Sequence, residues 1–192
     1  MISREFAATA LVVATTACGG VSPARDVECG SQPIEVLPNG SFDASTPVWM
    51  QDPATPELLC GKPGITPFDG TLAACLGATD GTIRTLTQTL PLPDGAKSVV
   101  LSGQICITTQ ETDATVHDTL TFDLLDGDTV VAALGQKTNK DGSAQCAFTT
   151  FQQTGTLTGD PVTATLRLRS TLDTANPTSF FIDALSVKVS CQ

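Results

Sequence analysis

The stretch Leu120–Leu134 reads LTFDLLDGDTVVAAL, and it decides the fold class. Apolar residues occupy every second position from Leu120 to Leu124, the Asp126-Gly127 pair follows, and a run rich in Val and Ala comes next. Apolar alternation at period two is the pattern of a half-buried β-strand. An Asp-Gly pair between two such runs favours the positive φ angles of a tight hairpin turn. The stretch therefore predicts two antiparallel strands joined by a hairpin.

Similar short apolar runs, separated by turn residues, continue on both sides of this hairpin. The predicted strands cover residues 34–37, 71–76, 82–90, 97–108, 120–124, 129–134, 146–155, 162–170 and 180–190. Residues 46–67 hold five prolines, which favour a long loop over a central strand. No segment shows a convincing helical period. About eight or nine short strands with frequent turns predict an all-β sandwich or barrel.

Length and charge limit the possible functions. The chain has 192 residues, which suffices for one domain with a sizeable core. Its 20 acidic and 10 basic residues give a net charge of −10. A charge of this sign argues against binding to nucleic acid and against electrostatic docking on anionic lipid. Carboxylates in this number could also bind metal ions.

The N-terminus carries a signal for location. Arg4 precedes an apolar run that ends at Ala17-Cys18-Gly19, too short to span a bilayer as a stable helix. This ending resembles the lipobox of bacterial lipoproteins, which implies cleavage before Cys18 and lipid on its sulfur. We expect a signal peptide at 1–17, a lipidated Cys and tether at 18–32, and a domain at 33–192. Gly19 resembles the residue found in lipoproteins of the outer membrane, so we expect an extracytoplasmic protein anchored there or at the cell surface.

Three further motifs resemble the galactose-binding-like jelly-roll superfamily. Residues 37–43, LPNGSFD, and the following Trp49 resemble its N-G-x-F-E…W opening. Residues 73–77 and 86–93 match its middle, and residues 180–187, FFIDALSV, resemble its F-x-I-D-D-V-S-V ending. The resemblance covers roughly residues 34–190. It implies a jelly-roll β-sandwich of about eight or nine antiparallel strands, in a superfamily that includes many carbohydrate-binding modules.

The cysteines point to disulfides. With Cys18 assigned to lipid, six cysteines remain, an even number for an oxidising compartment. They form no C-x-x-C pair, and the single histidine cannot complete a Cys/His zinc set. The ends of a jelly roll usually lie close together, so the resemblance implies a first bridge between the outermost cysteines. The expected pairs are Cys29–Cys191, Cys60–Cys75, which flanks the proline-rich loop, and Cys106–Cys146.

The resemblance also implies a structural Ca²⁺ site. Its members often bind calcium through an acid after the opening Phe and an acid in the closing strand, positions taken here by Asp43 and Asp183. Asp69 and Asp80 lie in the region between them and are further candidates. Ala184 departs from the family, which usually has a second Asp there. In the alternative interpretation, Asp43 caps a turn and Asp183 hydrogen-bonds a neighbouring loop.

Trp49 is the only Trp, and the chain has no Tyr. A flat ring can serve as a platform for the apolar face of a sugar, so Trp49 is a candidate ligand-binding residue. The competing interpretation, which we favour, places Trp49 in the core. The phenylalanines of the predicted strands are expected in the core as well: Phe122, Phe148, Phe151, Phe180 and Phe181.

No catalytic signature stands out. His117-Asp118 could suggest a hydrolase, but the sequence has no Gly-x-Ser-x-Gly elbow. Asp126 and Asp128 could resemble paired glycosidase carboxylates, but they flank the hairpin turn. We therefore expect no enzyme and no catalytic residues.

Two binding functions are left open. The first is a monomeric, lipid-anchored domain that docks a protein or another envelope partner. The alternative is a carbohydrate-binding surface module with weak affinity for polysaccharide. An exposed aromatic ring beside polar groups would favour the sugar ligand, whereas a flat apolar or Thr-rich face would favour a protein partner.

Overall fold

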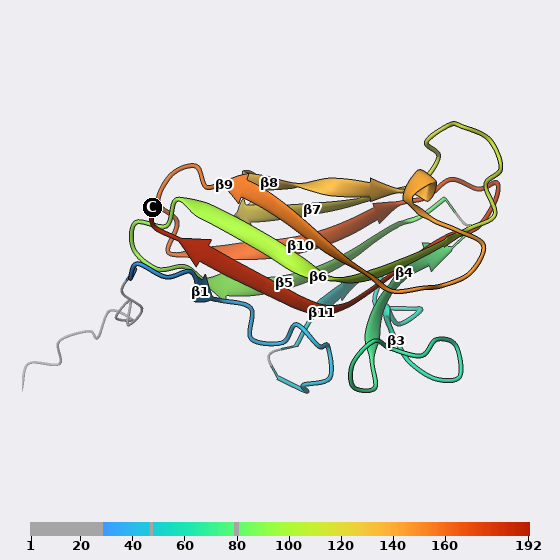
Figure 1. Cartoon of the computed structure of the whole chain (residues 1–192), viewed down its shortest axis with the longest axis horizontal. Helices are drawn as coiled ribbons and strands as arrows, with labels where there is room; N and C mark the ends of the chain where they lie inside the picture. The colour runs from blue at the N-terminus through green and yellow to red at the C-terminus, as the bar shows by residue number, and fades with distance from the viewer. Residues whose placement is uncertain (1–28, 47, 79–80) are drawn as a thin grey trace, which may run out of the picture.

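The computed structural model describes residues 29–46, 48–78 and 81–192 (Figure 1). The expected signal peptide, Cys18 and Asp80 lie outside these residues. The strands are β1 (Ile34–Glu35), β2 (Met50–Asp52), β3 (Leu59–Cys60), β4 (Ala73–Ala78), β5 (Ile83–Pro91), β6 (Ser98–Thr109), β7 (Thr119–Asp126), β8 (Thr129–Thr138), β9 (Thr149–Thr156), β10 (Thr163–Thr171) and β11 (Thr178–Ser190). In the part described, the only helix is the 3-10 turn η1 (Asn139–Asp141), and no helix there could cross a membrane.

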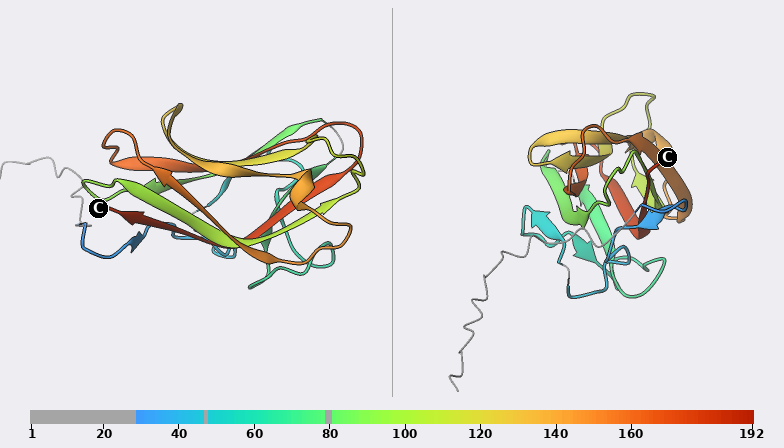
Figure 2. Two further views of the ribbon diagram at one scale, coloured as in Figure 1. Left: turned by 45° about the horizontal axis from the view of Figure 1, so that its top comes forward. Right: turned by 90° about the vertical axis from the view of Figure 1, so that its left-hand side faces the viewer.

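The strands form two antiparallel sheets that face each other (Figure 2). One sheet has six strands in the order β3-β4-β11-β6-β9, with β1 also paired to β11. The other has five strands in the order β2-β5-β10-β7-β8. The predicted all-β sandwich is therefore confirmed.

The hairpin predicted from Leu120–Leu134 is strands β7 and β8. Asp126 pairs with Thr129 across the turn, and Gly127 has a φ of 56°. Only glycine adopts this conformation without steric cost, which explains its place in the turn. β7 continues into the middle of its sheet, where it pairs with β10.

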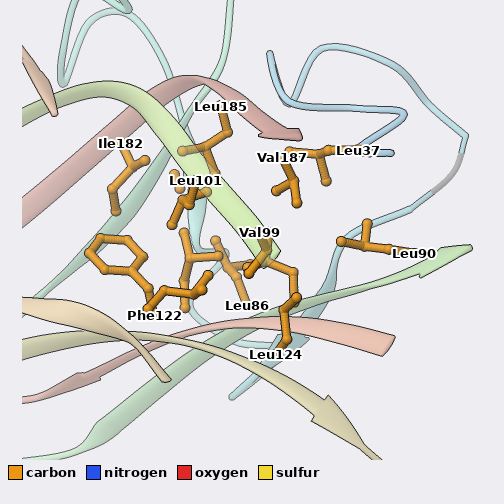
Figure 3. Close-up of a cluster of buried hydrophobic side chains, with 14 of the residues drawn as sticks. Leu37, Leu86, Leu90, Val99, Leu101, Phe122, Leu124, Ile182, Leu185 and Val187 are labelled. Atoms are coloured by element: carbon orange, nitrogen blue, oxygen red, sulfur yellow. The ribbon is translucent and has the colours of Figure 1, made fainter. Parts of the chain in front are cut away.

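The core lies between the two sheets (Figure 3). Leu86 of β5 and Phe122 of β7 point from the five-stranded sheet toward Leu101 of β6 and Val187 of β11 (Figure 3), and all four are completely buried. Burial of one such side chain contributes about 1.5–3 kcal/mol, and alternation along each strand supplies one every second residue.

Two strands of the structure were not predicted. β2 and β3 lie inside the proline-rich segment 46–67, which was expected to be a loop. Each is only two or three residues long and pairs along one edge, β2 with β5 and β3 with β4. Such short edge strands tolerate nearby prolines because one side of each strand makes no ladder. These strands form because a neighbouring strand pairs with them. Their own residues show no apolar alternation from which a strand could be predicted.

The core prediction for the phenylalanines holds in part. Phe122, Phe151 and Phe180 are buried, as expected. Phe148 and Phe181 are only partly buried, so their assignment to the core was wrong. Phe148 precedes Thr149, whose partner Ile105 faces the core, and alternation therefore places Phe148 on the outer face. Phe181 is paired with Cys106 next to inward-facing Ile182, so it also faces outward.

The structure forms the same three disulfides that the sequence suggests. Cys29 pairs with Cys191, Cys60 with Cys75, and Cys106 with Cys146, with Cα–Cα distances of 5.8, 5.9 and 5.4 Å. These separations lie in the usual range for a disulfide. The first bridge joins the start of the described chain to its C-terminus, which lies beside it in Figure 1. Three disulfides indicate an oxidising, extracytoplasmic environment.

Trp49 lies in the core, with only 2% of its surface exposed. Its ring packs on Phe42 at a centroid distance of 5.0 Å, and its Nε1 donates to the Asn39 carbonyl at 2.8 Å. The ring therefore presents no face to solvent. A ligand role for Trp49 stays a prediction that this burial disfavours.

Trp49→Ala should lower the free energy of unfolding by about 3–5 kcal/mol, because it leaves a large cavity. Trp49→Phe should cost less, since it keeps most of the packing and loses mainly the hydrogen bond, worth about 1 kcal/mol. Urea unfolding measures both changes. A loss of ligand binding in Trp49→Ala with unchanged stability would contradict the core assignment.

Candidate functional site

The opening and closing motifs of the sequence meet in space. Leu185 N donates to the Gly40 carbonyl at 2.9 Å, which joins the NGSF segment to β11. A Cβ on Gly40 would lie 1.8 Å from the Leu185 carbonyl oxygen, so this position requires glycine. The contact brings Asp43 and Asp183 to the same region of the molecule, as the sequence resemblance implies.

Asp183 lies at a bulge in β11. The pairing of β11 with β6 shifts between Asp183 and Ser186, and Ala184 has a positive φ of 47°. The Asp183 side chain is completely buried and accepts backbone hydrogen bonds from Asp69 N at 2.9 Å, from Ala184 N at 2.7 Å and from Phe68 N. Burial raises the pKa of this carboxyl, and the negative charge of Asp43 adds to the rise.

Asp43 accepts hydrogen bonds from the next residues of the loop that contains Phe68 and Asp69, which we call loop 61–72. Its Oδ1 accepts from Thr71 N at 2.8 Å, from Thr71 Oγ1 at 2.7 Å and from Leu72 N at 3.0 Å. These hydrogen bonds lower the pKa of Asp43, and the bond from the Thr71 hydroxyl has the largest effect. Gly70 has a φ of 60°, and a Cβ there would lie 1.7 Å from Asp43 Oδ2. Asp183 thus binds loop 61–72 to β11 of the six-stranded sheet, and Asp43 binds the same loop to the segment between β1 and β2.

These contacts bear on the expected calcium site. Asp183 already receives backbone N–H donors, and so does Asp43, which matches the alternative interpretation of both residues. In the described ranges, two sets of three side chains have ligand atoms close enough to share a metal ion, and neither set contains Asp43, Asp69 or Asp183. Calcium shared by Asp43 and Asp183 stays a prediction, and it would require some of these hydrogen bonds to give way.

Loop 61–72 presents an aromatic ring to solvent. Phe68 is 54% exposed, and its ring packs edge-on against Phe148 at a centroid distance of 6.0 Å. Phe148 lies just before β9, on the outer face of the six-stranded sheet. We call these two rings the Phe68–Phe148 pair. The sequence does not predict this pair, because Phe68 lies next to a proline-rich loop segment and Phe148 falls within a predicted strand, where a core position is expected.

Polar groups accompany this pair. Asp183, Gln104 and Thr150 are register partners across β11, β6 and β9, so they form one row on the outer face. Gln104 Nε2 donates to Thr150 Oγ1 at 3.0 Å. A hollow of about 330 Å³ lies in the same loop as Phe68 and is lined by Lys62, Thr66, Pro67, Gly70 and Thr71. An exposed aromatic surface beside hydrogen-bonding groups is suited to a sugar.

A second polar cluster lies at one end of the sandwich. His117 Nε2 is 3.0 Å from Asp113 Oδ1, and its Nδ1 is 3.4 Å from Asp173 Oδ2. Glu111 Oε2 lies 3.8 Å from the same Nε2. The hydrogen bond to Asp113 raises the pKa of His117. Together with Asp118, these residues make up both sets of side chains that could hold a metal ion: Glu111, Asp113 and His117, and Glu111, Asp118 and Asp173.

This geometry explains why His117 does not resemble a catalytic base. Its nearest acid is Asp113, not its sequence neighbour Asp118, which is buried and accepts from Asp173 N. Both imidazole nitrogens face carboxylates, which leaves neither of them for activating a hydroxyl nucleophile. The other acidic pair, Asp126 and Asp128, flanks Gly127 in the β7–β8 turn.

The sequence matches no protein-family model, and a search of curated proteins finds no significant relative. The fold is similar to that of TmCBM61 in complex with β-1,4-galactotriose, with a TM-score of 0.53 and 12% identity over 80% of this chain and 97% of that one. It is also similar to the CBM22-1 xylan-binding domain from Paenibacillus barcinonensis Xyn10C, at 12% identity, 86% and 99% coverage and a TM-score of 0.48. A third similar structure is the K3 adhesin domain of Lys-gingipain from Porphyromonas gingivalis, with 17% identity over 83% of this chain and 99% of that one and a TM-score of 0.48. At such identities the likeness to TmCBM61 establishes the sandwich fold alone, and the two lower scores add no weight.

Asp183→Ala should lower the free energy of unfolding by about 1–3 kcal/mol, because backbone N–H groups of the loop lose their acceptor. Asp183→Asn keeps an acceptor oxygen and should cost less. Amide exchange at Phe68 and Asp69 should become faster in the Ala variant. The exposed turn variant Asp128→Asn is the control, and equal exchange rates in all three variants would show that Asp183 does not hold the loop.

Proposed function

We propose that this protein is a carbohydrate-binding module whose sugar platform is the Phe68–Phe148 pair. The observation that carries the proposal is this pair, a solvent-facing aromatic surface next to Gln104 and Thr150. The apolar C–H face of a sugar ring packs on such a surface, while amide and hydroxyl groups bind its hydroxyls. The fold shared with a module that was crystallised with galactotriose supports the same function.

The platform is small, so the affinity should be weak. One aromatic pair and a few hydrogen bonds support a Kd of about 1 mM, which corresponds to about −4 kcal/mol. Polysaccharides repeat the same unit many times, so even weak binding retains a protein on an insoluble glycan. The function is binding without catalysis, in agreement with the surroundings of His117.

Docking of a protein, the first expectation from the sequence, is the second candidate function. The outer face of the five-stranded sheet favours it, because threonines alternate there with core residues on β5: Thr85, Thr87 and Thr89. Arg167 and Asp123 form an ion pair of 2.8 Å in the same sheet. This face is Thr-rich, as expected of a protein-docking surface, but the aromatic pair lies on the other sheet.

Phe68→Ala and Phe148→Ala should each weaken glycan binding by about 2- to 12-fold, since a lost aromatic contact is worth about 0.5–1.5 kcal/mol. Affinity electrophoresis through soluble polysaccharides, beginning with galactan, measures the change. Met50→Ala is a matched control, because Met50 is 72% exposed on β2 of the other sheet.

Wild-type affinity in both Phe variants would show that the platform is elsewhere. Absence of glycan binding, together with a protein ligand that is lost in Thr87→Lys, would replace the carbohydrate function with docking. Unfolding curves of each variant separate loss of the site from loss of the fold.

We also propose that the domain is anchored by lipid on Cys18. The support is the short apolar run that ends in Ala17-Cys18-Gly19 and the three disulfides of an exported protein. In bacteria grown with labelled fatty acid, the wild type should carry label and stay with the membrane, whereas Cys18→Ala should lose the label. Stable retention needs more than one acyl chain. Release of wild-type protein with an unmodified N-terminus would reject the anchor.

A further inference from the structure

Three carboxylates meet where the two sheets come together at one end of the sandwich. Glu111 follows β6 of the six-stranded sheet, whereas Asp118 precedes β7 and Asp173 follows β10 of the five-stranded sheet. The β6–β7 and β10–β11 loops lie at the right-hand end of Figure 1. One oxygen from each of the three side chains lies within 4.8 Å of the others.

One oxygen of each carboxylate accepts a hydrogen bond from a neighbouring residue. Asp118 Oδ1 accepts from Asp173 N at 2.8 Å, and Asp173 Oδ1 accepts from Ala175 N at 2.9 Å. Glu111 Oε2 accepts from Asn176 Nδ2 at 3.1 Å. These hydrogen bonds orient the side chains from outside, as supporting contacts do for ligands of a metal.

Two of the remaining oxygens are buried and lack a partner. Asp118 is 1% exposed and the Glu111 side chain is 4% exposed. Asp118 Oδ2 and Glu111 Oε1 make no hydrogen bond within the described part of the chain. A buried carboxylate oxygen without a donor is costly, and it calls for a bound ligand. Both oxygens belong to acids that face a third acid, and a cation would offset the repulsion among the three carboxylates, which a neutral donor would not.

We propose that Glu111, Asp118 and Asp173 bind one Ca²⁺ ion, a site distinct from Asp43 and Asp183 and independent of sugar binding. Calcium takes several carboxylate and carbonyl oxygens in flexible geometry, which suits ligands from three separate segments. Magnesium demands a nearly ideal octahedron, and zinc prefers nitrogen and sulfur ligands. His117, whose Nδ1 is 3.4 Å from Asp173 Oδ2, borders the site.

The position of the site predicts its effect on the fold. The ion would connect the end of β6 to the start of β7 and the end of β10, and so join one sheet to the other. Binding to the folded state alone would raise the melting temperature as calcium increases. His117 is the only histidine, so its imidazole signal reports on this site without further assignment.

The test uses the purified protein after treatment with a chelator. Calorimetric titration should show one Ca²⁺ bound here with a Kd of about 1 mM or tighter. Added Mn²⁺ should selectively broaden the His117 imidazole resonances, and excess Ca²⁺ should restore them. Asp118→Asn and Asp173→Asn should each weaken Ca²⁺ binding by about tenfold or more.

Two variants serve as charge-matched controls. Asp43→Asn removes an acid of the other calcium candidate, and Asp128→Asn removes an exposed turn acid; both should keep the binding and the broadening. No binding at millimolar Ca²⁺, or broadening that persists unchanged in Asp118→Asn, would overturn the proposal. Binding lost in Asp43→Asn but kept in Asp118→Asn would also overturn it. If Asp118→Asn does not fold, Glu111→Gln and the wild-type broadening decide the question.

Discussion

The proposed binding surface depends on the hydrogen bonds of one buried carboxylate, that of Asp183. Its position in β11 is fixed by pairing to β6, and its oxygens accept backbone N–H groups from the loop that carries Phe68. Loop 61–72 contains two prolines and no strand, and the Cys60–Cys75 disulfide closes it. The hydrogen bonds to Asp183 and Asp43 are therefore contacts that help to hold the exposed ring of Phe68 beside Phe148.

Burial of a carboxylate is expensive, which its raised pKa reflects. The cost is acceptable here because several amides surround the group and the sandwich around it is well packed. Phe180, Ile182 and Val187 of the same strand are completely buried. The strand that fixes Asp183 is therefore anchored in the core by its inward-facing side chains. An ordered loop can present a rigid aromatic surface, and rigidity reduces the entropy lost when a ligand binds.

The fold could be predicted from the sequence because strand alternation is a local property. The β7–β8 hairpin follows directly from LTFDLLDGDTVVAAL, and inward-facing leucines mark β10 in the same way. β2 and β3 could not be predicted, since their hydrogen bonds come from neighbouring edges and not from their own residues. Phe148 was misplaced for a related reason. It lies one residue outside β9, and only the pairing of Thr149 with Ile105 shows which way its ring faces.

The candidate sites were harder to predict because hydrogen-bond satisfaction is not visible in a sequence. Motif resemblance drew attention to Asp43 and Asp183, yet backbone amides already supply donors to both. Glu111 and Asp118 belong to no recognisable motif, yet each keeps one buried oxygen that has no donor among the residues that the structure describes. An aspartate carboxylate thus has two different roles here. At Asp183 it accepts hydrogen bonds from loop amides, and at Asp118 it is the proposed ligand of a cation. What separates the two roles is the number of N–H groups that the surrounding backbone brings within reach. In the first case a bulged strand and a loop turn their amides inward, whereas in the second three acids converge from three chain segments and face one another.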